Sequence, residues 1–209
     1  MKRLFALCLF VSGCCIFSPA LLAASKEKVA EPTIPSVSSR GAYMAELTLS
    51  SKTKPLVRKN MQKRLLQLQE LFPGCVVAMR DSVVACVIFP ASEVFCSNDT
   101  VLSDGGMEWL KRGIKLFPDA DNFHIVVSVH TANTGTSTNI ARFSQQRAEA
   151  VAEALKQNIK TTTVIVPFGM GDAEPIARNN TYQGREKNRR VEIWFIPTTS
   201  WAERLASRR

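Results

Sequence analysis

Histidine is nearly absent from this chain of 209 residues, which contains only His124 and His130. Neither stands at a zinc-ligand spacing from a cysteine. Ser128, His130 and Asp172 have the residue types of a Ser/His/Asp catalytic triad, but no nucleophile-elbow pattern surrounds them. Because a lone histidine needs a positioned partner before it can catalyse a reaction, we predict a protein that is not an enzyme and has no metal and no cofactor.

Acidic residues are also few, with 18 Asp and Glu against 27 Lys and Arg and a formal net charge of +9. Such an excess can indicate binding to nucleic acid or to an anionic membrane. The excess belongs to the ends of the chain: residues 1–74 hold 11 basic and 4 acidic residues, whereas residues 75–197 hold 13 of each. A neutral domain offers no broad positive surface for phosphates, so we expect no nucleic-acid partner.

The start of the chain is typical of an exported protein. Met1-Lys2-Arg3 precedes an apolar run from Leu4 to Val11, the length of a signal-peptide core. Val11-Ser12-Gly13-Cys14 resembles the bacterial lipobox, in which a peptidase cuts before a cysteine that carries diacylglycerol. We therefore assign residues 1–24 to a signal peptide, with cleavage before Cys14 and lipidation of that cysteine.

By the sorting rules of such lipoproteins, Cys15 in place of Asp favours the periplasmic face of the outer membrane. Two alternatives stay open. Cleavage near Ala23 and Ala24 would release a soluble periplasmic protein, and an uncleaved segment from Leu4 to Ala24 would be just long enough to span a bilayer.

Basic segments flank the neutral region. Residues 25–53, which include Pro32 and Pro35, are polar and lack apolar periodicity, so they are interpreted as a linker. Residues 54–73 predict a basic amphipathic helix that packs on the domain by its apolar face, with a membrane or partner role as the alternative. Residues 198–209 are interpreted as a basic C-terminal tail.

Four cysteines remain beyond Cys14, and the sequence does not choose among their three pairings. Cys75 and Cys86 flank the polar Arg80-Asp81 and could face each other across a hairpin. The oxidising compartment would permit a disulfide between them. The alternative is that both are small buried apolar side chains.

From residue 75 onward, β-rich runs alternate with helical patterns, and no internal repeat is visible. This alternation predicts an α+β sandwich whose mixed β-sheet is covered by helices on one face. Strands are expected over 76–79, 83–88, 125–129, 164–168 and 191–196, and helices over 104–116 and 144–158.

One helix start stands out as a candidate anion site. Ser144 is a good N-cap, which would put Arg147 in the first helical turn. There the free backbone N–H groups and the guanidinium would together bind a carboxylate.

Three blocks resemble the OmpA C-terminal-like domain, a family shared with the peptidoglycan-associated lipoprotein and the flagellar stator protein. The likeness extends over residues 75–197. The blocks are His130-Thr131-x-Asn133-x-Gly135, Ser144-x-x-Arg147-Ala148 with Val151 and Leu155, and the stretch from Gly169-Met170-Gly171-Asp172 to Asn188-Arg189-Arg190-Val191-Glu192-Ile193.

The resemblance implies binding of the zwitterionic diaminopimelate side chain of peptidoglycan. An Asp of the family takes its ammonium and the Arg at position 147 takes its carboxylate. This chain has Ala132 at the Asp position, and Ile140 replaces a family Asn, with Asn139 adjacent. The expected ligand-binding residues are Arg147, Thr131, Asn133, Asn139, Asn188 and Arg189.

Two functions are compatible with a site that lacks the Asp. The first is an outer-membrane-associated protein that binds peptidoglycan non-covalently and tethers the envelope. The second is a scaffold subunit of an envelope-spanning machine, for example a type IVB secretion core, which uses the fold for protein contacts. An unpaired ligand ammonium costs about 1–3 kcal/mol, enough to weaken binding about 10- to 100-fold.

Overall fold

The computed structural model describes residues 49–159 and 162–207. The predicted signal peptide, Cys14, Cys15 and nearly all of the predicted linker lie outside the described residues. Within the described ranges, no helix combines the length and the apolar character that crossing a membrane requires.

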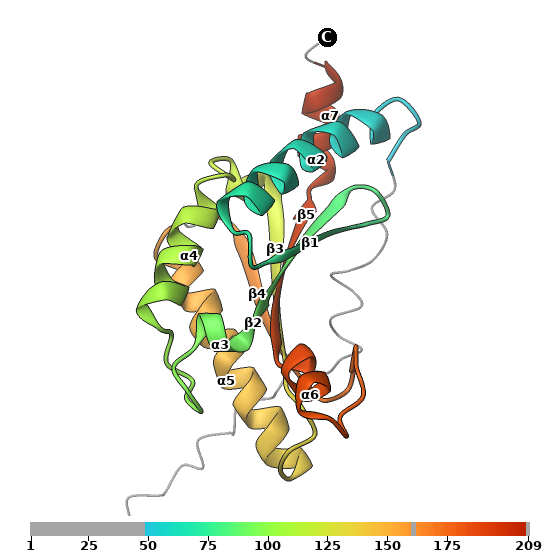
Figure 1. The fold of residues 1–209 in the computed structure, drawn as a ribbon. Helices are drawn as coiled ribbons and strands as arrows, with labels where there is room; N and C mark the ends of the chain where they lie inside the picture. The colour runs from blue at the N-terminus through green and yellow to red at the C-terminus, as the bar shows by residue number, and fades with distance from the viewer. Residues whose placement is uncertain (1–48, 160–161, 208–209) are drawn as a thin grey trace, which may run out of the picture. The chain divides into compact units, whose positions relative to one another are not determined.

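A five-stranded mixed sheet forms the centre of the fold (Figure 1). Its spatial order is β1-β2-β5-β3-β4, and β3 and β4 run parallel while the other neighbouring strands are antiparallel. The fold class expected from the sequence is therefore confirmed. The strands are β1 (Val76–Arg80), β2 (Val84–Pro90), β3 (Phe123–His130), β4 (Val164–Gly171) and β5 (Arg190–Pro197).

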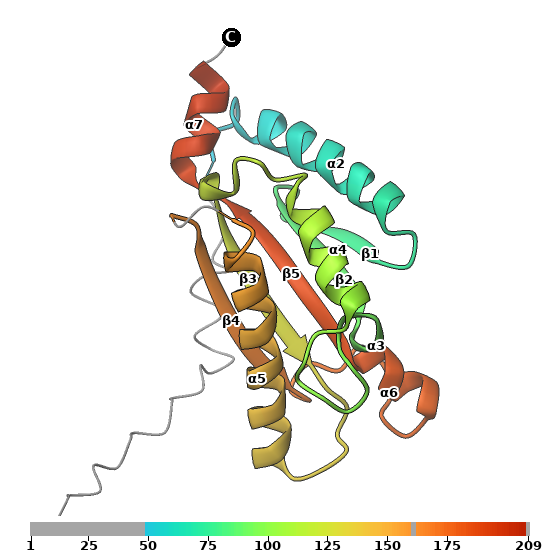
Figure 2. The same cartoon turned by 90° about the vertical axis from the view of Figure 1, so that its left-hand side faces the viewer.

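Three helices, α2, α4 and α5, cover one face of this sheet (Figure 2). Leu68, Leu110 and Leu155, one from each helix, border the same narrow apolar cleft as Val87 and Ile193 of the sheet. The α-helices of the described chain are α2 (Lys54–Leu71), α3 (Ala91–Val94), α4 (Asp104–Ile114), α5 (Ser137–Lys156), α6 (Tyr182–Asn188) and α7 (Thr199–Ser207), with a 3-10 turn η1 at Ala120–Asn122.

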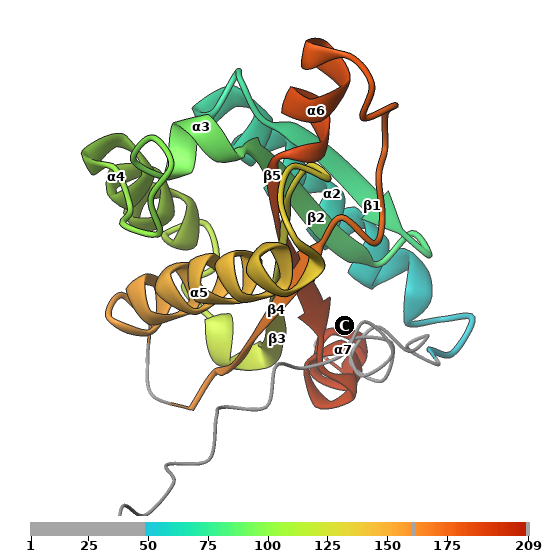
Figure 3. The same cartoon turned by 90° about the horizontal axis from the view of Figure 1, so that it is seen from below.

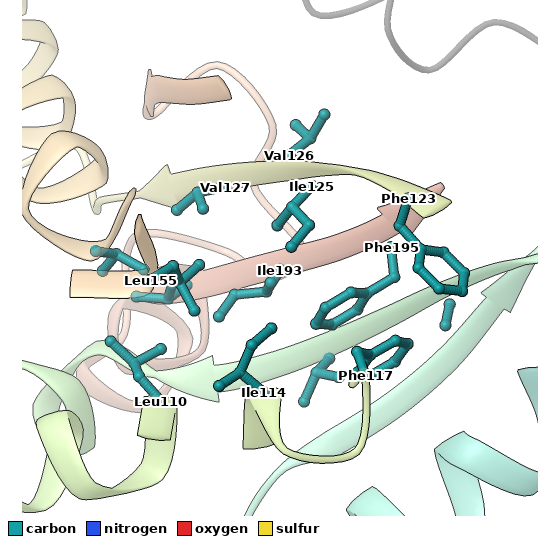
Figure 4. Close-up of a cluster of buried hydrophobic side chains, with 14 of the residues drawn as sticks. Leu110, Ile114, Phe117, Phe123, Ile125, Val126, Val127, Leu155, Ile193 and Phe195 are labelled. Atoms are coloured by element: carbon teal, nitrogen blue, oxygen red, sulfur yellow. The ribbon is translucent and has the colours of Figure 1, made fainter. Parts of the chain in front are cut away.

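Strand periodicity decides which side chains enter this core. Ile125 and Val127 point toward Leu155 and Ile193, whereas Val126 between them points to the opposite face of the sheet (Figure 4). Successive residues of a strand face opposite sides, so alternate apolar residues supply one core face. All three β3 side chains are fully buried.

The basic helix and the C-terminal segment are parts of this core, which corrects their description as flanks. Val57, Met61 and Leu65 of α2 are buried and join the main apolar cluster. The expected tail forms α7, whose Trp201 is buried and whose ring lies 4.9 Å from that of Phe123. Helix α2 thus packs on the domain by its apolar face, as predicted for residues 54–73.

Arg64 connects α2 to the end of the sheet. Its guanidinium makes two hydrogen bonds to the Asp119 carboxylate, of 2.8 and 3.0 Å, and a third to the backbone oxygen of Leu116. The same group lies 5.1 Å from the ring centroid of Phe117 and 5.3 Å from that of Phe123. Hydrogen bonds and cation–π contacts of Arg64 thus together attach this basic helix to the rest of the domain.

The predicted Cys75–Cys86 disulfide is wrong. The expected hairpin exists, but in its register Cys86 faces Ala78, and Cys75 precedes the first pair, Val76 with Ile88. The two cysteines therefore do not face each other, and both side chains are buried. Burial raises the pKa of the Cys75 thiol, which favours its unreactive protonated form.

Candidate functional site

A pocket of about 660 Å³ lies at the end of the sheet where β3 ends and β5 begins. Its walls come from α3 and the loop after it, the loop after β3, the first half of α5, and α6. These elements are far apart in the sequence but meet at one end of the sheet (Figures 1 and 3). Arg147, Arg189, Ala132 and Phe95 are among the residues that line it.

Arg147 is anchored at the base of this pocket. Its guanidinium lies between two rings, 4.5 Å from the centroid of Phe95 and 4.3 Å from that of Phe143. Its Nε donates a 2.8 Å hydrogen bond to the backbone oxygen of Asp99. Within the described part of the chain this is the one hydrogen bond of the guanidinium, so both terminal nitrogens keep donors for a ligand.

The Arg147 guanidinium stays positively charged although it is buried. Desolvation lowers the pKa of Arg147 to about 10, and the positive charge of Arg189 adds to the decrease. The group is still protonated at neutral pH. A charged, ring-stacked and partly desolvated guanidinium is a strong receptor for a carboxylate or another planar anion.

The sequence predicted that Arg147 lies in the first turn of a helix and binds an anion there, and this placement is wrong. Helix α5 begins at Ser137, and its N-cap is Thr136 rather than Ser144. Arg147 therefore lies about three turns inside the helix, beyond the reach of the terminal dipole. Ser144 instead accepts a 3.1 Å hydrogen bond from the backbone nitrogen of Gly171 and so joins α5 to β4.

Two glycines let α5 approach β4 this closely. A Cβ at Gly169 would lie 2.3 Å from the backbone nitrogen of Gln145, so a close approach, not a turn, requires glycine there. Gly171 has a φ of +53°, a conformation that glycine adopts without strain. These contacts hold the helix that carries Arg147 in a fixed place over the sheet.

Further arginines make the pocket positive. Arg142 and Arg189 line it together with Arg147, and Glu186 is its one acidic lining residue. Glu186 already forms an ion pair with Arg189. The formal charge of the lining residues is therefore an excess of two positive charges, which favours an anionic ligand.

The position of the missing family Asp is part of this wall. Ala132 lines the pocket, and its residue is 1% exposed. Ile140, at the position of the family Asn, also lines the pocket and is buried, with Gly171 close to it. Methyl and aliphatic groups thus replace the carboxylate and the amide that the family pattern would supply.

The other predicted ligand residues divide into two groups. Thr131, Asn139 and Arg189 line the pocket, whereas Asn133 is exposed and does not line it. Asn188 is fully buried and its amide is saturated: Oδ1 accepts from the backbone nitrogens of Ile176 and Ala177, and Nδ2 donates to two oxygens. Asn188 therefore orders the loop before α6 and is not available to a ligand.

A buried ionic cluster lies where β3 ends and β5 begins, and its residues do not line the pocket. The Arg190 guanidinium donates a 2.7 Å hydrogen bond to Glu192, and Nε2 of His130 lies 3.3 Å from the same carboxylate. Burial would raise the pKa of Glu192, but His130 and Arg190 outweigh it and hold the pKa at about 2. Arg190 and Glu192 are thus buried neighbours on one face of β5.

Sequence reasoning missed several lining residues. Phe143 stands four positions before Arg147, a helical spacing that could have indicated a stacked pair. Tyr182 and Glu186 carry no such signal, because the polar sequence of α6 has no apolar periodicity. Arg142 is an exposed polar residue of α5 and carries none either.

Comparison with known proteins identifies the class of this domain. Residues 94–189 match the model of the OmpA family, so the chain carries an OmpA family domain. The protein named Probable lipoprotein YiaD from Escherichia coli is 34% identical over 108 residues, which is 52% of this chain and 49% of that protein. Peptidoglycan-binding protein ArfA from Mycobacterium bovis is 40% identical over 80 residues, 38% of this chain and 24% of that protein.

A solved structure shares the fold. The MotB-like protein from Desulfovibrio vulgaris superposes with a TM-score of 0.60 at 18% identity, covering 69% of this chain and 99% of that one. This chain spans about half or less of the length of the two curated relatives. The family match, residues 94–189, includes most of the residues that line the pocket.

Proposed function

We propose that the protein binds peptidoglycan non-covalently through this pocket, with Arg147 receiving a carboxylate of the stem peptide. The supporting observation is the ring-stacked guanidinium, whose terminal nitrogens face no partner in the described part of the chain. The relative named as peptidoglycan-binding aligns with 38% of this chain. The protein would act as a binding protein rather than an enzyme.

The same proposal includes an anchor at the outer membrane. The lipobox at residues 11–14 would place a lipid on Cys14, and the chain from there to residue 48 would connect that lipid to the domain. One of the relatives is named a probable lipoprotein, which supports this arrangement. Incorporation of labelled palmitate that is lost in Cys14→Ala is the expected result, and unchanged labelling would refute the lipid anchor.

Wall binding is tested by co-sedimentation of the full-length protein, in mild detergent, with purified sacculi. Arg147→Ala is expected to weaken sedimentation by about tenfold or more, since a charge-assisted, bidentate contact is lost. Arg58→Ala removes an exposed arginine of α2, outside the pocket, and serves as the matched control. Equal losses in the two variants would indicate unspecific charge attraction and contradict the proposal.

Arg147→Lys is a second variant in which a folding defect is less expected. It keeps the positive charge but lacks the paired N–H donors of the guanidinium. Its thermal midpoint is measured beside its binding. A folded lysine variant with full sedimentation would exclude a bidentate role for Arg147.

A scaffold role in an envelope machine is the second candidate, and the observation that favours it is Ala132. Without a carboxylate at this position, the pocket has no ion-pair partner there for the ammonium of a zwitterionic ligand. Wild-type protein that does not sediment with sacculi at all would favour the scaffold over the tether.

A further inference from the structure

The charge balance of the pocket restricts which carboxylates suit it. Three arginines line the pocket against Glu186 alone, and Glu186 is paired with Arg189. An amino-acid end group carries its ammonium on the same carbon as its carboxylate. A ligand carboxylate bound by Arg147 would therefore bring a free ammonium into surroundings that are already positive.

The uncharged part of the wall adds to this restriction. Ala132, Ile140 and Phe143 line the pocket with apolar groups, and both Ala132 and Ile140 are buried. An ammonium that loses water against such groups finds no counter-ion, which is costly for a charged donor. A nitrogen that carries an acyl group is neutral, and its acyl carbons would instead cover apolar surface.

We propose that, at the side-chain end of diaminopimelate, this pocket selects a carboxylate whose neighbouring nitrogen is acylated over one whose neighbouring nitrogen is a free ammonium. This inference rests on the proposed function and specifies its ligand. In peptidoglycan the acylated form is the diaminopimelate whose side-chain amine already takes part in a cross-link. The protein would thus prefer joined stem peptides to unjoined ones.

Two synthetic stem tripeptides test the preference. Both are L-Ala-γ-D-Glu-meso-diaminopimelate, and they differ by acetylation of the diaminopimelate side-chain amine. Titration calorimetry with full-length wild-type protein is expected to show about 10-fold tighter binding of the acetylated peptide. This is the loss of affinity expected when one charge of the ligand is left unpaired. This comparison involves no variant and so does not depend on the folding of one.

Variants at position 132 test the cause. Ala132→Asp supplies a counter-ion for the ammonium and is expected to reverse the order of the two peptides. Ala132→Asn adds a side chain of similar size without charge and is expected to keep the wild-type order. Reversal by Asn as well would show that space or hydrogen bonding, not charge, sets the preference.

The possible outcomes distinguish a failure of the selectivity from a failure of peptidoglycan binding itself. If wild-type protein binds both peptides equally, or the free amine better, the selectivity is refuted while wall binding stands. If it binds neither peptide and does not sediment with sacculi, both proposals fail. If it binds neither peptide but does sediment, wall binding stands through another part of peptidoglycan and the selectivity is refuted.

Discussion

Replacement of Arg64 by Met should destabilise the whole domain, although this residue belongs to a helix that the sequence places outside it. The side chain of Arg64 is 14% exposed and that of Asp119 is 30% exposed. The substitution removes two charge-assisted hydrogen bonds to Asp119, one to a backbone oxygen, and the contacts with aromatic faces. Breaking a pair of this kind costs about 3 kcal/mol, and the aromatic contacts add about 1 kcal/mol.

Urea unfolding of the full-length protein at pH 7 measures the cost, and a double-mutant cycle isolates the ion pair. Asp119→Asn keeps the shape of the side chain and removes its charge. The two substitutions are expected to be non-additive by about 1–3 kcal/mol, because each one removes the partner of the other. A loss below about 1 kcal/mol for Arg64→Met, with strict additivity, would refute a structural role for this pair.

The pH dependence of the same variant provides a second check. Burial would raise the pKa of Asp119, but Arg64 outweighs that effect and lowers it. A depressed carboxyl pKa stabilises the fold above the unfolded value, and that stabilisation is lost as the pH falls through the folded value. The difference in stability between wild type and Arg64→Met should therefore be largest near neutral pH and shrink below about pH 4.

Three further predictions concern the sheet and the pocket. With a pKa of about 2 against an ordinary 4.5, Glu192 should make urea stability fall as the pH drops from 4.5 toward 2, and Glu192→Gln should flatten that dependence. Gly169→Ala should lower stability by about 1–3 kcal/mol because its Cβ meets the α5 backbone, whereas Gly74→Ala, with open space around it, should change it little in the same thermal melts. Asn188→Ala should cost about 2–3 kcal/mol by leaving loop hydrogen bonds unmade; a binding defect with an unchanged thermal midpoint would instead assign Asn188 to the ligand.

Strands were the most predictable part of this fold. Phe123–His130 and Arg190–Pro197 are short apolar runs bounded by polar segments, and both were expected within two residues of their observed bounds. Strand ends extend further than the apolar run because ladder hydrogen bonds continue through polar residues such as His130 and Arg190. Element bounds are the least certain feature of any sequence-based assignment.

Helix starts were harder to predict. Thr136 and Ser144 are both N-cap residue types, and the apolar periodicity that follows Ser144 made it the better candidate. The first two turns of α5 are largely exposed because they border the pocket, so they carry little of the apolar pattern that marks a helix. Helix α7 was missed for a different reason, since its nine residues contain only two buried side chains.

Arg147, the expected ligand residue, lines the pocket, but its environment differs from the one predicted at a helix start. The ring of Phe95 and the backbone oxygen of Asp99 reach it from a loop about 50 residues earlier in the chain. No local pattern can show such a contact, because it arises when α3 and α5 meet across the sheet. Resemblance to a family supplied the residue, and tertiary structure supplied the reason that it stays charged and oriented.

Helices α3 and α6, which line the pocket, lie at one end of the sheet, and the described chain begins near the other end (Figure 1). Strands β3 and β5 run between these two ends, paired from Phe123 with Pro197 to His130 with Arg190. In a tether, a pulling force between the bound wall and residue 49 would enter the domain through α2, which packs against β1, β2 and α7. The packing that buries the apolar face of α2 would therefore also bear the mechanical load.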